Sequence, residues 1–133
     1  MKLENNWEQK ALENLEKKPI EIPNTNFPLV NKVLKLRKIP LNELSVENIR
    51  LMIGQNEGLM YLVPLAIKVL KDDLLVEGDY YPGDLLQNIL SRPSWFWKEH
   101  KEIWENVHDL IKDRIDEIAD RGISVKAFYN IVI

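Results

Sequence analysis

Two histidines, His100 and His108, are the side chains of this sequence best suited to acid–base chemistry near neutral pH. Glu105 stands three residues before His108 and forms a single Glu-x-x-His motif on a predicted helix. A di-iron site in a helical bundle needs two such motifs and two further glutamates. Because only one motif is present, the pattern favours histidines on a solvated surface. Cysteine, which would add thiolate ligands or nucleophiles, is absent. We therefore expect no metal and no cofactor.

A second candidate for catalysis is a pair of carboxylates, Asp79 and Asp84, in the segment VEGDYYPGDLL at 76–86. Two carboxylates at a suitable distance can act as acid and base in glycoside hydrolysis. Acidic residues are also common at helix starts, where the macrodipole favours negative charge. The chain has no Gly-x-Ser-x-Gly motif and no glycine-rich phosphate loop. We do not expect an enzyme, since an active site built on these carboxylates or on His108 would need a cleft in which they converge.

The same segment also has a purely local interpretation. Asp79 or Tyr81 would cap a helix, Pro82 would lie in its first turn, and Asp84 would lie near its positive end. One feature is left unexplained, because residues 72–91 carry five acidic side chains and no lysine or arginine. Acidic residues that repel one another are useful where a surface meets a basic partner.

Length, composition and net charge exclude several classes of protein. The 133 residues fit one domain, placed at 1–133, and the formal net charge of −3 argues against simple binding of a phosphate backbone. The basic run Lys32, Lys35, Arg37 and Lys38 is interpreted as the solvated face of one helix. The N-terminus lacks the apolar core of a signal peptide, and no apolar stretch is long enough to span a membrane. We expect a cytoplasmic protein that binds neither nucleic acid nor membrane.

Helical periodicity dominates the chain and predicts an all-α fold, a compact single-domain bundle of about six helices. Segment 58–73 is apolar on all sides, which is typical of a central buried helix. Ser45 and Ser94 are the predicted N-caps, and Gly122 is the residue after the last long helix. The tail, 123–133, is predicted as an edge strand or a short helix. The expected helices, the first two separated by a proline-rich linker, are 3–18, 28–39, 46–55, 58–73, 84–92 and 94–121.

Three consecutive aromatic residues, Trp95, Phe96 and Trp97, open the longest predicted helix. At most two of them can face the core, because consecutive helical side chains point about 100° apart. The third would be exposed, and an exposed tryptophan is a typical interface anchor. The simpler interpretation is that the triplet packs against the end of this helix.

The central region carries a specific order of motifs, in RKIPLNELSVENIRLMIGQNEGLMYLVPLAIKVL and LVEGDYYPGDLLQNIL, which together cover about residues 36–90. A Pro-Leu pair leads into a Glu-x-x-Arg-Leu helix and an Ile-Gly-Gln turn. A Gly-Leu, a Leu-Val-Pro-Leu-Ala helix and a Gly-Asp-x-Tyr-Pro-Gly-Asp-Leu-Leu segment follow. This order resembles the immunity proteins of bacterial contact-dependent growth inhibition systems. The matching positions are Pro40, Leu41, Glu47, Arg50, Leu51, Ile53, Gly54, Gln55, Gly58, Leu59, Leu62, Val63, Pro64, Leu65, Ala66, Gly78, Asp79, Tyr81, Pro82, Gly83, Asp84, Leu85 and Leu86.

The resemblance implies a small cytoplasmic protein that binds and neutralises the C-terminal toxin domain delivered by a neighbouring cell. Such toxins are often nucleases and hence basic around the substrate cleft. An acidic immunity protein would be steered onto that cleft and would block it without chemistry of its own. The expected partner is therefore the cognate toxin domain. The predicted contact residues are Asp72, Asp73, Glu77, Asp79, Tyr80, Asp84, Glu99 and Glu102, with Asp109 and Asp113 as further candidates.

A motif shared by proteins that bind different toxins is also suited to a structural role. In that interpretation Glu47, Arg50, Gln55 and Asp84 form buried pairs that hold helices together. Scaffold and interface thus stay open for the Gly-Asp-Tyr-Tyr-Pro-Gly-Asp segment, as does the oligomeric state. The alternative function is a helical adaptor that shares the scaffold and binds an unrelated protein.

Overall fold

The computed structural model of the protein describes residues 3, 5–18 and 25–131. Over these residues the fold is all-α, as predicted, and the one β-type pairing is an isolated bridge between Glu77 and Pro82. The predicted linker falls largely at 19–24, outside the described residues. The elements in chain order are η1 (Trp7–Gln9), α1 (Leu12–Leu15), α2 (Pro28–Leu36), η2 (Leu41–Glu43), α3 (Val46–Gly54), α4 (Leu59–Asp72), α5 (Asp84–Leu90), α6 (Ser94–Glu99), α7 (Lys101–Ile111), α8 (Ile115–Asp120) and α9 (Lys126–Tyr129).

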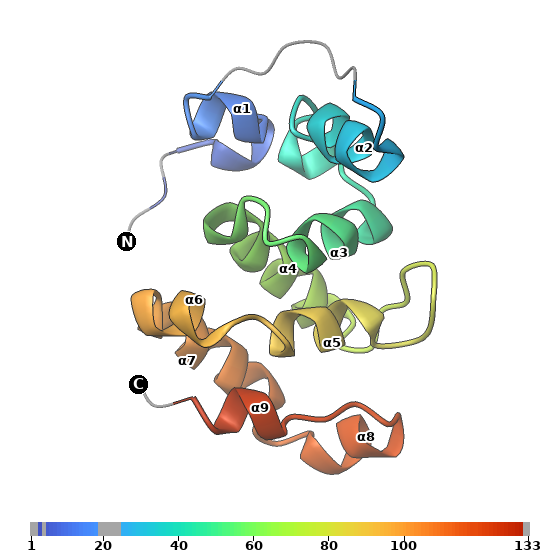
Figure 1. Ribbon diagram of the computed structural model, residues 1–133. Coiled ribbons are helices and arrows are strands. Elements are labelled where there is room, and N and C mark those ends of the chain that lie inside the picture. Colours follow the sequence, from blue (N-terminus) through green and yellow to red (C-terminus); the bar gives the residue numbers. More distant parts are fainter. Residues whose placement is uncertain (1–2, 4, 19–24, 132–133) are drawn as a thin grey trace.

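The helices follow one another through the molecule in tiers (Figure 1). α1 and α2 lie at one end, α3 and α4 come next, α5 and α6 follow, and α8 and α9 lie at the other end. α3 packs against α4 and α5, and α4 also packs against α7. α4 is thus the central helix, which confirms the prediction from its apolar sequence. Its buried residues are Leu59, Leu62, Val63, Leu65, Ala66, Ile67 and Leu70.

Local signals set several helix boundaries as predicted. The Ser45 hydroxyl accepts a hydrogen bond from the Asn48 backbone N–H at 3.1 Å and caps α3. Pro28 is the first residue of α2. Gly58 before α4 and Gly122 after α8 have φ values of 55° and 75°, left-handed backbones that favour glycine. Each signal acts within one turn of chain, so the sequence is enough to locate it.

The continuous helix predicted over 3–18 is wrong. η1 and α1 are separated by an extended backbone at Lys10. The Leu41 N–H donates to the Lys10 carbonyl at 3.1 Å, and the Glu13 N–H donates to the Arg37 carbonyl at 3.1 Å. Because the backbone of this segment pairs with η2 and with the end of α2, it leaves the helical path that its periodicity favours.

The long helix predicted over 94–121 is divided into α6, α7 and α8. The breaks fall at His100, with φ −132° and ψ 60°, and at Arg114, with φ −128° and ψ 20°. A straight helix of that length would extend about 42 Å, which is longer than a compact domain of this size is wide, so the bends keep its apolar side on one core. The predicted Ser94 cap is also wrong, because the N-cap position of α6 is Pro93 and Ser94 is already helical.

The described part of the tail folds as a helix, α9, and not as a strand. The Phe128 ring stacks on Trp104 at a centroid distance of 4.9 Å and meets Trp97 edge-on at 5.2 Å. The Trp104 indole N–H donates to the Phe128 carbonyl at 3.1 Å. These contacts hold α9 against α6 and α7. Phe96 and Trp97 of the aromatic triplet are buried and Trp95 is 50% exposed. The helical spacing predicted that one of the three would be exposed, without indicating which.

Candidate functional site

The loop between α4 and α5 carries four of the eight predicted contact residues, Asp73, Glu77, Asp79 and Tyr80, and is closed on itself. It projects from the side of the molecule (Figure 1). An isolated antiparallel bridge joins its two arms at Glu77 and Pro82. Gly83 follows with a φ of 90°, and this left-handed turn directs the chain into α5. We call residues 77–83 the tyrosine loop, after the two tyrosines in its middle.

Asp84, the first residue of α5, fastens the tyrosine loop from inside. It is only 3% exposed. Its Oδ1 accepts a hydrogen bond from the Gly78 N–H at 2.7 Å, and its Oδ2 accepts one from the Tyr80 N–H at 3.1 Å. Hydrogen bonds from backbone N–H groups to a carboxylate are stronger than those between neutral groups. The buried charge is therefore satisfied by the loop that it shapes.

This arrangement corrects the predicted start of α5. The N-cap position is Gly83, which has no side chain to cap the helix, so the predicted caps Asp79 and Tyr81 are wrong. Pro82 lies before the helix and not in its first turn. Asp84 does lie at the positive end of α5, but its side-chain bonds go back to the loop.

An ion pair on α3 holds the tyrosine loop from the other side. The Arg50 Nε and Nη2 donate to the two carboxylate oxygens of Glu47 at 2.6 and 2.5 Å. Glu47 Oε1 also accepts the Asp79 N–H at 2.9 Å. The bond from Arg50 holds the pKa of Glu47 below its ordinary value, and Glu47 raises the pKa of Arg50. Of the residues predicted to form buried pairs, Glu47 and Arg50 pair with each other and are half-buried, whereas Gln55 is exposed.

Gly78 is the point at which the two anchors meet. A Cβ added there would lie 2.8 Å from Glu47 Oε1 and 2.9 Å from Asp84 Oδ2. Both distances are shorter than a carbon–oxygen van der Waals contact, so the loop can approach the two carboxylates only with glycine at this position. The glycine thus lets α3 and α5 hold one loop from two sides.

The hydrogen bonds of Asp84, Glu47 and Arg50 hold a loop whose side chains are exposed. Tyr80 is 69% exposed, and the Arg50 Cζ lies 4.6 Å from the centroid of its ring, a cation–π contact. Tyr81 is 43% exposed, and Glu77 and Asp79 are exposed beside the tyrosines in the same loop. The loop therefore shows two tyrosines and two carboxylates on a backbone that half-buried and buried groups hold in place.

Two arginines from other elements lie near the acidic residues of 72–91. Asp72 and Asp73, at the end of α4, are exposed. Glu117 raises the pKa of Arg114, and Asp73 adds to that shift. Arg50 lies under Tyr80. Because Glu47 and Glu117 already pair with these two arginines, the region keeps its negative charge. Four of its five acids are exposed, and the fifth, Asp84, is buried.

The arrangement can be compared with known families. The family model of CDI immunity proteins, those of contact-dependent growth inhibition, matches residues 13–107, which is well over half of the chain. The chain belongs to the CDI immunity protein family. The match takes in α3, the tyrosine loop and α5, and reaches well beyond the 36–90 region of the resemblance. No curated protein and no solved structure gives a significant match.

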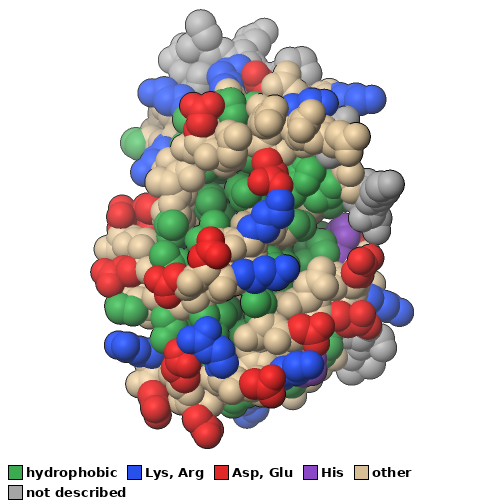
Figure 2. Space-filling view, turned by 180° about the vertical axis from the view of Figure 1, so that it is seen from behind, with side chains coloured by type: hydrophobic (Ala, Val, Ile, Leu, Met, Phe, Trp, Pro, Cys, Tyr) green, Lys and Arg blue, Asp and Glu red, His purple; other side chains and the backbone are tan. Residues whose placement is uncertain are grey.

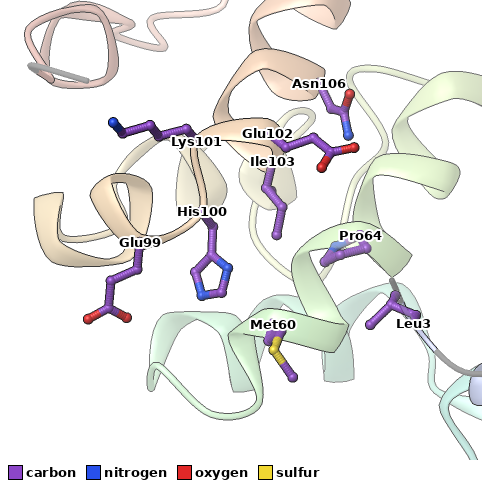
Figure 3. A pocket seen from close by; sticks show the side chains of 9 residues that line it. All are labelled: Leu3, Met60, Pro64, Glu99, His100, Lys101, Glu102, Ile103 and Asn106. Carbon is purple, nitrogen blue, oxygen red and sulfur yellow. The ribbon is translucent and has the colours of Figure 1, made fainter. Parts of the chain in front are cut away.

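Two of the predicted contact residues of this family member lie away from the loop. Glu99 ends α6 and Glu102 lies in the first turn of α7, at the opposite end of α5 from the tyrosine loop (Figure 1). They border a cavity of about 440 Å³ that Met60 and Pro64 of α4 also line. The His100 side chain points toward α4, whereas Glu99 points outward (Figure 3). The predicted contact residues thus form two groups and not one surface.

Two candidate catalytic residues, Asp84 and His108, make contacts within the fold. The Asp84 carboxylate is buried, and each of its oxygens accepts a backbone N–H of the tyrosine loop. His108 stacks on Trp104 at 5.1 Å, with Tyr129 edge-on at 5.3 Å. Over the described residues no three histidine or acidic side chains are grouped to hold a metal ion, and no helix there is long and apolar enough to cross a membrane.

One residue of the predicted solvated basic face is buried. Arg37 is 5% exposed and donates to Glu16 at 2.5 Å and to Glu57 at 3.0 Å. Lys32 and Lys35 are exposed, as predicted. On the face shown in Figure 2, acidic and basic side chains are interspersed. No sequence signal marks Arg37, because its partners lie 21 and 20 residues away in the chain.

Proposed function

We propose that this protein binds and neutralises the toxin domain of a contact-dependent growth inhibition system, in the cytoplasm, without catalysis or a cofactor. Family membership supports this function. The observation that carries the proposal is the tyrosine loop, whose exposed acids and Tyr80 lie on a backbone held by Glu47 and Asp84. A surface that is ordered before binding loses less conformational entropy on association, which suits tight inhibition.

In this proposal the toxin is a nuclease with basic residues around its cleft. The exposed acids Asp72, Asp73, Glu77 and Asp79 attract the cleft, and Tyr80 contacts it. Asp84 leaves the contact set, because at 3% exposure it offers a partner no surface. Its role is to shape the loop.

Glu99 and Glu102 form a second acidic group beyond the other end of α5. They are proposed contacts for a toxin domain that reaches from the tyrosine loop along α5 to the α6–α7 junction. Lysine substitutions at these two positions test this part separately. If they leave both the association and the dissociation rates unchanged, the interface is confined to the tyrosine-loop side.

The first experiment is a binding assay with the toxin domain encoded beside this protein, followed by an assay of toxin activity. We expect a one-to-one complex of nanomolar affinity or better, equivalent to about −12 kcal/mol, and loss of toxin activity in proportion to the protein added. The absence of binding would contradict the proposal. It would favour the adaptor alternative, for which the exposed apolar residues Phe27, Leu29 and Val30 at the start of α2 offer a surface.

If the protein blocks the active-site cleft of the toxin, one further result is expected that binding elsewhere on the toxin would not give. A toxin loaded with a non-cleavable nucleic-acid substrate should be unable to bind the protein, because both would occupy the basic cleft. If the ternary complex forms and is inactive, the protein inhibits from outside the cleft, and the neutralising function itself still stands.

Electrostatic steering is tested by a triple variant, Asp72→Lys, Asp73→Lys and Glu77→Lys. We expect association with the toxin to slow by about ten-fold or more at low salt and to lose most of its salt dependence. The matched control is Glu43→Lys, Glu105→Lys and Asp120→Lys, which makes the same charge change at exposed positions on other elements. Equal association rates for the two triple variants would show that only net charge matters and not the acidic surface.

A further inference from the structure

Tyr80 combines high exposure with a fixed position. The residue is 69% exposed, yet its backbone N–H donates to the buried Asp84 carboxylate at 3.1 Å. One ring face lies against the Arg50 guanidinium, whose Cζ is 4.6 Å from the ring centroid. Arg50 in turn is held by two bonds to Glu47. An aromatic side chain that is ordered in this way before binding loses little entropy when a partner covers it.

The chemistry around Tyr80 favours a cation on its other face. Arg50 does not give the site a net positive charge, because Glu47 pairs with it on both carboxylate oxygens. The remaining charges in the loop are the exposed carboxylates of Glu77 and Asp79. The face of a tyrosine ring is itself negative, so ring and carboxylates attract the same kind of group.

We propose that Tyr80 is the anchor of the tyrosine loop, and that its free face binds an arginine or lysine side chain of the toxin, with Glu77 and Asp79 at the rim. This inference rests on the function proposed above and specifies the partner chemistry at that site. Arg50, Glu47 and Asp84 are then positioning residues. They set where the ring stands and do not touch the toxin.

Three substitutions at adjacent positions separate the possible contacts of Tyr80. Tyr80→Phe keeps the ring and removes the hydroxyl, whereas Tyr80→Leu keeps an apolar side chain and removes the ring. Tyr81→Leu is the matched control in the neighbouring residue, which is 43% exposed. We expect the dissociation rate of the toxin complex to change less than about two-fold for Tyr80→Phe and to rise about ten- to thirty-fold for Tyr80→Leu. Tyr81→Leu should stay within a few-fold of the wild type.

The outcomes distinguish this inference from the proposed function. If the wild-type protein binds the toxin but Tyr80→Leu dissociates at the wild-type rate, the anchor is elsewhere and neutralisation stands. If Tyr80→Phe is as damaging as Tyr80→Leu, the hydroxyl is the contact and the cation is not. If the wild type does not bind, the proposed function itself fails. Thermal unfolding of each variant confirms that the change lies at the surface.

The cation is identified from the toxin side. Each arginine and lysine of the toxin surface is replaced by alanine, and the dissociation rate is measured against wild-type and Tyr80→Leu protein. One basic residue is expected to lose its effect when the ring is absent, since the two side chains then share one interaction. If every alanine variant has the same effect on both backgrounds, no basic side chain contacts the ring, and the inference is overturned.

Discussion

Two arginines of this protein form similar ion pairs with glutamates, but one pair holds the fold together and the other positions an exposed side chain. Arg37 is 5% exposed and joins Glu16, just after α1, to Glu57 in the turn between α3 and α4. Arg50 pairs with Glu47 on its own helix, and Glu47 carries the connection to the tyrosine loop through the Asp79 N–H. Both pairs therefore tie parts of the chain that are distant in sequence.

The difference lies in where each network ends. The Arg37 cluster ends on carboxylates that belong to the fold, so its bonds serve only to hold α1, α2 and the α3–α4 turn together. The Arg50 network ends on Tyr80, which is 69% exposed. The same guanidinium–carboxylate chemistry thus stabilises the fold in one place and positions a surface in the other. Variants of the two networks should accordingly separate stability from binding.

The largest loss of stability is expected for Arg37→Ala. The variant loses two charge-assisted hydrogen bonds and the packing of a buried side chain, and we expect the free energy of unfolding to fall by about 3 kcal/mol. Urea unfolding followed by circular dichroism measures this loss. The dissociation rate of the toxin complex should be unchanged at a temperature at which the variant is folded, because the tyrosine loop does not contact this cluster.

Lys38→Ala is the matched control for Arg37→Ala. Lys38 pairs with Glu13 at 2.9 Å, but its side chain is 36% exposed, so the loss should be about 0.5 kcal/mol or less. A change in toxin dissociation for Arg37→Ala, with Lys38→Ala unaffected, would mean that the two networks are coupled through α3. The distinction between them would then have to be given up.

The next largest effect is expected for Asp84→Asn, which should change both the free energy of unfolding and the dissociation rate of the toxin complex. The asparagine amide would present an N–H group to a backbone N–H, so one of two charge-assisted bonds is lost at a buried site, at a cost of about 2 kcal/mol. The freed loop should also let the toxin dissociate faster. Hydrogen exchange at the Gly78 and Tyr80 amides reports the loop directly, since these are the two donors to Asp84.

Gly78→Ala disrupts the contact between the tyrosine loop and the Glu47 and Asp84 carboxylates by a change in the loop itself. Its Cβ would lie 2.8 Å from Glu47 Oε1, so the loop must move away from α3. Gly122→Ala is the comparison, because a Cβ there meets nothing within 4 Å and the cost comes from the left-handed backbone alone. Rapid amide exchange in the loop is expected for Gly78→Ala only. If the loop amides stay protected in that variant, the anchors do not hold the loop.

The parts of the fold that could be predicted from sequence depend on local chemistry. Pro28 and Ser45 start helices, and Gly58 and Gly122 supply left-handed turns, within a few residues of where the signal stands. The spacing of the aromatic triplet likewise predicted one exposed residue, and the fold shows that it is Trp95. Such features need no knowledge of the rest of the chain.

The parts that could not be predicted depend on contacts between distant residues. Periodicity alone favours one helix over 94–121, and the break at His100 follows from packing against the core. Asp84 stands where an acid favours a helix start, so only the fold shows that its carboxylate turns back to the loop. Arg37 appears in the sequence as one of four nearby bases. Its burial depends on Glu16 and Glu57, which the fold brings to it.

Apart from the control variants, the smallest predicted change in the free energy of unfolding is for Glu47→Gln, and it depends on pH. The hydrogen bond from Arg50 lowers the pKa of Glu47 in the folded protein below its ordinary value of 4.5. The carboxylate therefore stabilises the fold fully above pH 4.5, and this contribution is lost as the pH falls through the lowered folded pKa. We expect Glu47→Gln to be less stable than the wild type by about 1 kcal/mol at pH 7. The difference should shrink below pH 4.5, and urea unfolding across a pH series measures it.

Glu117→Gln shows whether Glu47 is an anchor or an ordinary surface pair. A hydrogen bond from Arg114 also lowers the pKa of Glu117, but this carboxylate is exposed and its pair should be screened by salt. We expect Glu117→Gln to match the wild type in 0.5 M salt, a concentration chosen as roughly three times the physiological ionic strength, whereas the Glu47→Gln difference should persist. If both differences vanish in salt, the Arg50 pair contributes no more than a surface ion pair. The tyrosine loop would then be held by Asp84 alone.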